Sequence, residues 1–198
     1  MTRFGLRHNG IVNMTADVRG VTVTSGEGET ARIDVPFPPL SIGHREPIEA
    51  VIDHCAGIGS IGLILVRAGA HSVGICRDGV VTASSTDTHY VQGRTAAGGW
   101  SQQRYARRRG NQLGAAQTST AGAAARVLTG ARLAALVVGG DIRSITAVLQ
   151  DRRLGWLNTL PRREFRDIGE PRRAVLDDVA RRSLELSITV RGPAAGGR

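Results

Sequence analysis

The 198-residue sequence contains no lysine, only two cysteines and few aromatic residues. All 26 basic residues are arginines, so every basic contact can use a planar, forked guanidinium. Aromatic residues make up 4% of the chain, so we expect a core built mainly from Val, Leu, Ile and Ala. Cys55 and Cys76 fit no metal-ligand spacing, which predicts reduced and buried thiols.

The sequence also lacks the patterns of membrane proteins and of common catalytic sites. No apolar run approaches the roughly 20 residues that cross a bilayer, and no signal peptide is visible, which predicts a cytoplasmic protein. The five histidines show no paired ligand spacing, and Ser101 lacks the Gly-x-Ser-x-Gly frame of a nucleophile elbow. Gly139-Gly140-Asp141 lacks the context of a phosphate loop and predicts a tight turn with a helix cap. We therefore expect neither a metal nor a cofactor.

Acidic residues are missing from one long block of the chain. The formal net charge is +9, with a pI near 11.3, which favours a polyanionic partner. Residues 1–87 carry 7 Arg and 9 acids, and residues 141–198 carry 12 Arg and 8 acids. Residues 88–140 carry 7 Arg and no acid. A coding bias toward arginine would not remove Asp and Glu locally, so the block predicts a basic surface.

Four arginines of this block stand close together in a predicted helix. Arg104, Arg107 and Arg108 are spaced by three and four residues and share one helical face, and Arg109 lies on the adjoining face. A solvated charged face normally alternates in sign, whereas like charges at this spacing cost a few tenths of a kcal/mol each. Phosphate groups would offset that cost, so we expect these four residues and Arg94 to bind nucleic acid.

The predicted elements are strands first and then strands alternating with helices. Alternating runs on either side of a Gly-rich turn predict strands at Gly20–Ser25 and Thr30–Val35, and Pro47 begins a helical pattern. Further strands are predicted at Ile61–Val66, which is apolar enough to be buried on both faces, and at Ser72–Cys76, Val80–Ser84, 132–139, 164–168 and 184–190.

Helices are predicted at Gln102–Leu128, with a kink or break at its glycines, at Ile142–Leu149 after an Asp141 cap, and at 171–183. This order predicts an α/β protein with an α+β mixed sheet flanked by helices. The expected organisation is a β-rich N-terminal segment (1–40), a catalytic domain (41–192) and a flexible tail (193–198).

The segment HYVQGRTAAGGWSQQRYARRRGNQ (89–112) resembles the bacterial, actinobacterial-type branch of the Vms-like release-factor family. The later segments VVGGDIRSITAVLQDRRL (137–154) and EPRRAVLDDV (170–179) are also similar to that family, so the resemblance spans roughly Arg3 to Val190. It implies a fold like the catalytic middle domain of eukaryotic and archaeal class-1 release factors, in which a Gly-Gly-Gln loop stands at the mouth of a long helix.

The resemblance implies a metal-independent peptidyl-tRNA hydrolase that rescues stalled ribosomes in ribosome quality control. Eukaryotic relatives carry a looser glycine–x–x–glutamine pattern, which Gly99-Trp100-Ser101-Gln102 fits. Gln102 is then the catalytic position, with Gln103 as the alternative in register, and Gly98 and Gly99 let the loop approach the ester. The implied partners are the large-subunit rRNA and peptidyl-tRNA, and no membrane or DNA.

Two alternatives remain open at this point. The chain could be a non-catalytic RNA- or ribosome-binding module whose loop serves only for docking. Trp100 could stack on a base or pack on the sheet as an anchor. A metal-dependent nuclease would need clustered carboxylates near the basic block, which contains none.

Overall fold

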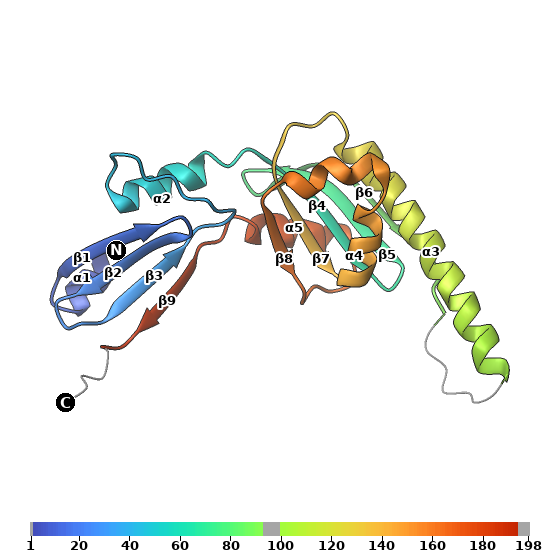
Figure 1. Cartoon of the computed structure of the whole chain (residues 1–198), viewed down its shortest axis with the longest axis horizontal. Helices are drawn as coiled ribbons and strands as arrows, with labels where there is room; N and C mark the ends of the chain where they lie inside the picture. Colours follow the sequence, from blue (N-terminus) through green and yellow to red (C-terminus); the bar gives the residue numbers. More distant parts are fainter. Residues whose placement is uncertain (1, 93–99, 194–198) are drawn as a thin grey trace. The chain divides into compact units, whose positions relative to one another are not determined.

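The computed structural model describes residues 2–92 and 100–193, with the backbone alone for residues 2 and 100–102. The chain forms two compact units, each built on one sheet (Figure 1). The terminal unit comprises Met1–Ile58 and Leu184–Arg198, and the central unit comprises Gly59–Ser183. Among the described residues, no helix has both the length and the apolar character needed to cross a membrane.

The terminal unit contains a four-stranded antiparallel sheet in the order β1-β2-β3-β9. Its elements are α1 (Thr2–Arg7), β1 (Ile11–Asp17), β2 (Gly20–Ser25), β3 (Thr30–Asp34), α2 (Pro47–Ala56) and β9 (Ser187–Arg191). Alternate residues of β2 and β3, including Val21, Val23 and Ile33, are buried together with Ala50 and Val51 of α2. The two predicted strands and the helix beginning at Pro47 are confirmed.

The boundaries of the two units differ from the expected divisions at 40/41 and 192/193. Ile188 pairs with Ile33 and Val190 with Ala31, so the last strand joins the N-terminal sheet. Helix α2 packs against that same sheet. Both features bring together residues that are far apart in the sequence, and a local pattern of apolar residues carries no information about such pairing.

The central unit contains a mixed five-stranded sheet in the order β6-β5-β4-β7-β8. Its strands are β4 (Ser60–Arg67), β5 (Ala70–Arg77), β6 (Val80–Thr88), β7 (Leu133–Gly140) and β8 (Arg162–Phe165). The pairs β4–β7 and β7–β8 are parallel, and the pairs of the β4-β5-β6 meander are antiparallel. Residues Ile61–Val66 of the middle strand β4 are all buried, as predicted.

Helices cover both faces of this sheet, which confirms the predicted fold class. On one face, side chains of α3 (Trp100–Leu128), α4 (Ile142–Leu149) and the 3-10 helix η1 (Arg152–Thr159) form a common core with Ile64 and Val138. The other face carries α5 (Arg173–Arg182), where a Cβ on Gly74 would stand 2.9 Å from Leu176 Cδ2. The sheet is therefore the middle layer of three.

Helix α3 is continuous from Trp100 to Leu128, and the predicted break is absent from this range. Gly110 and Gly114 stand in open space, where an added Cβ would meet nothing within 4 Å. Each helical glycine costs about 1 kcal/mol relative to alanine. The burial of Ala123, Ala124 and Leu128 anchors the C-terminal half of the helix on the sheet.

The turn between β7 and α4 is fixed by one glycine and one carboxylate. Gly140 has a φ of 99°, in the left-handed region, and a Cβ there would overlap the Val66 carbonyl oxygen. The Asp141 carboxylate then accepts a hydrogen bond from the Arg143 amide at 3.2 Å, which confirms the predicted cap. Helix α4 is thereby set directly on the end of the parallel strand pair.

The replacement Gly140→Ala should destabilise the protein by more than about 2 kcal/mol, because left-handed strain adds to steric overlap with a backbone carbonyl. Urea unfolding followed by far-UV circular dichroism measures this loss. Gly155→Ala is the matched control, since its Cβ would stand in open space. Equal midpoints for the two variants would contradict the close approach of Gly140 to β4.

Candidate nucleic-acid interface

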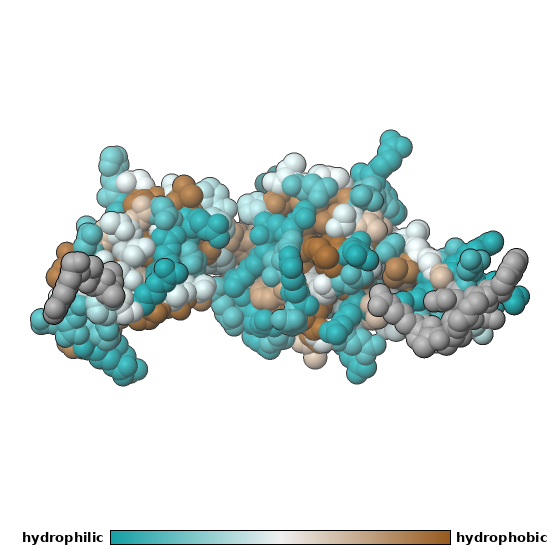
Figure 2. All heavy atoms as spheres, turned by 60° about the horizontal axis from the view of Figure 1, so that its bottom comes forward, coloured by the Kyte–Doolittle hydropathy of each residue, from teal (hydrophilic) through white to brown (hydrophobic). Residues whose placement is uncertain are grey.

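Helix α3 is divided into a packed half and a projecting half (Figure 1). Its first buried residue is Ala116, and buried residues recur from there to Leu128. Residues 103–111 are all exposed except Arg109, which is half-buried. We call residues 100–111 the projecting segment; at 1.5 Å per residue it is about 18 Å long. The part of α3 visible at the right of Figure 2 is largely hydrophilic.

The structure brings four predicted RNA-binding residues together on the projecting segment. Arg104, Arg107 and Arg108 are exposed. The Nε atom of Arg109 is buried and has no hydrogen-bond partner among the described residues. None of the four forms an ion pair with a described residue, and α3 contains no Asp or Glu. The predicted basic face is present, and no described carboxylate neutralises it.

Unpaired arginines at this place make the segment attractive to anions. The N-terminus of a helix carries a partial positive charge, since its first N–H groups have no intrahelical acceptor. Arginines in the first three turns add to that charge instead of opposing it. An anion such as phosphate can meet both the guanidinium forks and the helix terminus. The segment is therefore suited to bind a chain of phosphates.

Two glutamine side chains connect α3 to its neighbours, one to the segment that follows β6 and one to α4. Gln112, at the base of the projecting segment, accepts a hydrogen bond from the Gln92 amide at 2.9 Å. Gln117 donates to Ser144 Oγ at 3.3 Å, and the Ser144 hydroxyl donates to the Asp141 carboxylate at 2.6 Å. The connection between β6 and α3 thus departs from a fixed point beside the helix.

The remaining predicted residues lie at or before the start of α3. Arg94, Gly98 and Gly99 lie outside the described residues. The backbone of Gln102 is described, and Gln102 is the third residue of the helix that begins at Trp100. Gln103, the alternative in register, is exposed. The side chains of Trp100 and Gln102 lie outside the described part, so stacking and anchoring by Trp100 both remain predictions.

A pair of histidines at the end of the β6 strand was not predicted from the sequence. The rings of His71 and His89 stack with centroids 6.1 Å apart, and His89 Nε2 lies 3.6 Å from a carboxylate oxygen of Asp87. Burial lowers the pKa of His71, the charge of Asp87 raises it, and electrostatic interactions with His89 and Arg126 lower it further. His71 is therefore neutral at pH 7. Only the register of β5 with β6 brings these rings together.

The cysteines are free thiols, as predicted, and they offer no nucleophile. Cys76 is fully buried, and burial raises the pKa of its thiol to about 11, against a smaller lowering by a hydrogen bond with Ser183. Burial also raises the pKa of the half-buried Cys55. Both thiols therefore stay protonated near neutral pH, and thiolate is the reactive form.

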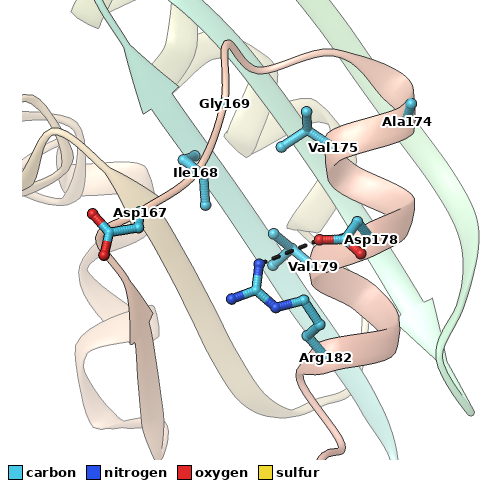
Figure 3. A pocket seen from close by; sticks show the side chains of 8 residues that line it. All are labelled: Asp167, Ile168, Gly169, Ala174, Val175, Asp178, Val179 and Arg182. Carbon is cyan, nitrogen blue, oxygen red and sulfur yellow. Dashed lines mark hydrogen bonds and ion pairs between the residues drawn. The ribbon is translucent and has the colours of Figure 1, made fainter.

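A pocket of about 360 Å³ lies against α5 in the central unit (Figure 3). Ile168, Val175 and Val179 form its apolar wall. Arg182 donates to the Asp178 carboxylate at 3.2 Å across one side, so these two charges are satisfied within the protein. None of the predicted site residues is among those that line this pocket.

The replacement Gln112→Ala should loosen the connection at Gln92 and leave the packed half of α3 unchanged. Loss of one hydrogen bond worth about 1 kcal/mol corresponds to roughly fivefold faster exchange of the Gln92 amide. Hydrogen–deuterium exchange of a peptide covering residues 88–92 measures the change. The control Gln117→Ala removes a glutamine from the same helix and should leave that peptide unaffected; equal effects would refute the tether.

One of the comparisons with known proteins identifies a family. A family model described as the Actinobacteria/chloroflexi VLRF1 release factor matches residues 59–189. One solved structure, of the archaeal translation termination factor aRF1, is similar at 12% identity with a TM-score of 0.35. That match covers 81% of this chain and 51% of the archaeal chain, so the present chain spans about half of its length. Among curated proteins no match is found.

Proposed function

The chain belongs to the Actinobacteria/chloroflexi VLRF1 release factor family, and on that premise we propose that it is a peptidyl-tRNA hydrolase acting on stalled ribosomal complexes. One observation carries the proposal within this chain. A helix with four arginines that form no ion pair with a described residue projects from the central unit, and a glycine pair followed by Gln102 stands at its tip in the sequence. The proposed substrate places the activity at cytoplasmic ribosomes.

The arginines of the projecting segment bind RNA phosphates in this proposal. Guanidinium groups pair with phosphate through two parallel hydrogen bonds, which gives orientation as well as affinity. Arg104 and Arg108 share a face that would follow one strand of large-subunit rRNA or the tRNA acceptor end, and Arg107 and Arg109 contact phosphates beside it. Arg94, before the glycines, adds a further contact. The tip of α3 is thereby held near the tRNA 3′ end.

Hydrolysis requires a water molecule to add to the ester carbonyl between the nascent peptide and the tRNA 3′ adenosine. The C–O bond to the ribose then breaks, and the ribose oxygen takes up one proton of the water. The products are a free tRNA hydroxyl, a peptide carboxylate and one proton released to solvent. Gln102 is the third residue of α3, so its N–H belongs to the first turn, where no intrahelical acceptor exists. This N–H or the side-chain amide orients the water or donates to the developing oxyanion.

Gly98 and Gly99 let the backbone approach the ester closely, because neither residue carries a side chain. The mechanism rests on positioning, and none of its steps routes a proton through a histidine, a carboxylate or a metal. This fits a projecting segment that contains no Asp, Glu, His or Cys. In this mechanism the ribosome supplies the other groups that surround the ester and the water.

A non-catalytic RNA-binding module is the alternative, and one observation favours it. Trp100 and Ser101 stand between the glycines and Gln102, and the helix already begins at Trp100. In this alternative the arginines hold the chain on the ribosome and the tip serves for docking. Binding would then be retained without any release of peptide.

The replacement Gln102→Ala should lower the rate of peptide release about 10²- to 10³-fold, the usual effect of removing a donor that stabilises an oxyanion. Release from stalled large-subunit–peptidyl-tRNA complexes, followed as loss of the tRNA-linked peptide on a gel, measures the rate. Gln103→Ala is the matched control and should retain most of the activity. Impaired release by Gln103→Ala with activity retained by Gln102→Ala would move the catalytic position to Gln103.

The wild-type rate separates the two functions. Absence of release by the wild type, together with tight binding to the complexes, supports the docking module. Equal release by the wild type and Gln102→Ala contradicts a catalytic role for the side chain of this glutamine.

Replacing Arg104 and Arg108 together by alanine should flatten the salt dependence of RNA binding. On single strands, each lost phosphate contact lowers the steepness of the plot of log binding constant against log salt concentration by about 0.7. The pair should therefore lower it by about 1.4. Fluorescence anisotropy with a labelled rRNA fragment at several salt concentrations measures the slope. The control pair Arg153→Ala and Arg172→Ala removes the same charge from residues paired with Asp151 and Glu170. An equal loss of slope in the control would show that net charge alone matters.

A further inference from the structure

The terminal unit brings one histidine and two glutamates together in an arrangement that the proposed function does not use. Nδ1 of His8 and one carboxylate oxygen each of Glu27 and Glu29 all lie within 4.8 Å of one another. Nδ1 is 3.7 Å from the Glu27 oxygen and also contacts the Glu29 oxygen. The side chains of His8 and Glu29 are 25% and 23% exposed, which leaves them accessible from one side only.

Two turns hold these three residues in place. His8 follows α1, where its amide donates to the Gly5 carbonyl at 3.3 Å and its ring lies 4.9 Å from that of Phe4. Glu27 and Glu29 stand in the turn between β2 and β3. The Gly26 amide donates to the Gly10 carbonyl at 3.2 Å and so joins the two turns.

The joined turns leave little room for movement. A Cβ at Gly26 would overlap the Asn9 carbonyl oxygen. The Glu29 amide also donates to Ser25 Oγ at 3.1 Å. The ligand atoms are therefore carried by a backbone that is fixed before any ion binds.

An ion pair with His8 alone does not satisfy this group. Nδ1 can carry only one proton, yet two carboxylate oxygens converge on it. The Glu29 Oε2 atom is buried, and its contact with His8 Nδ1 is its only polar partner outside Glu27 among the described residues. No described arginine pairs with either glutamate. Two converging carboxylates with so little compensation repel each other, and a cation placed among the three atoms removes that repulsion.

We propose that His8, Glu27 and Glu29 bind a divalent transition-metal ion, for which zinc is the best fit. Imidazole nitrogen with carboxylate oxygen suits zinc, whereas magnesium and calcium take oxygen ligands throughout. Tetrahedral ligands about 2.1 Å from zinc are roughly 3.4 Å from one another, close to the 3.7 Å between Nδ1 and the Glu27 oxygen. Water fills the fourth position, because Glu27 is 54% exposed.

The bound ion links the N-terminal helix to the sheet. Helix α1 has only six residues, and a helix of that length has little stability by itself. Zinc binding to the folded unit shifts the unfolding equilibrium by mass action and raises the melting temperature. This role concerns the terminal unit and does not depend on peptide release.

Titration of the tag-free, chelator-treated full chain with Zn²⁺ in a calorimeter tests the site. We expect one saturable ion per chain and a rise in the melting temperature on adding zinc. His8→Ala and Glu29→Gln should each weaken the affinity by at least about tenfold, since even loss of an outer-sphere partner costs tenfold or more. Substitution with Co²⁺ should give the visible absorption of a tetrahedral nitrogen–oxygen site.

His44→Ala and Glu46→Gln are the matched controls, because both residues are exposed in the same unit and outside the group. Unchanged affinity in the controls with loss in the site variants supports the proposal. Should His8→Ala fail to fold, Glu27→Gln in the exposed turn replaces it. Absence of saturable binding up to about 1 mM zinc, or equal affinity in the site and control variants, overturns the site.

Discussion

The burial of the second half of α3 against the central sheet is the contact on which the candidate site depends. Ala123, Ala124 and Leu128 are fully inaccessible to solvent, and they share a core with Ile64 of the middle strand. Small alanine side chains let the helix axis approach the sheet closely. One half of the helix is fixed in this way, and the other half projects from the sheet with residues 103–111 exposed except for the half-buried Arg109.

The distribution of charge follows from the same division. Several arginines elsewhere in the central unit have acidic partners within the protein: Arg153 pairs with Asp151, and Arg173 with Asp177. The arginines of the projecting segment have none among the described residues. Exposed ion pairs contribute little to stability, so this contrast matters for recognition more than for folding. The unpaired guanidinium groups are available to a polyanion, and the paired ones are not.

Several elements were predictable because their signals are local. The all-apolar run Ile61–Val66 predicted a strand buried on both faces, and β4 is the middle strand. Asp141 predicted a cap, which the short-range hydrogen bond to the Arg143 amide provides. The grouping of Arg104, Arg107 and Arg108 on one face could be predicted from the period of a helix alone. Of the kink or break expected at the glycines of α3, the break was wrong, since the helix is continuous from Trp100 to Leu128.

The sequence by itself determined the α/β class, the long basic helix and the place of the glycine–glutamine motif ahead of it. It could do so because these properties depend on residues within one or two turns of each other. Only the tertiary structure decided that β9 joins β3, that His71 stacks on His89, and that His8 meets Glu27 and Glu29. Each of these contacts is set by strand register or by the packing of two turns, which depends on the free energy of the whole fold.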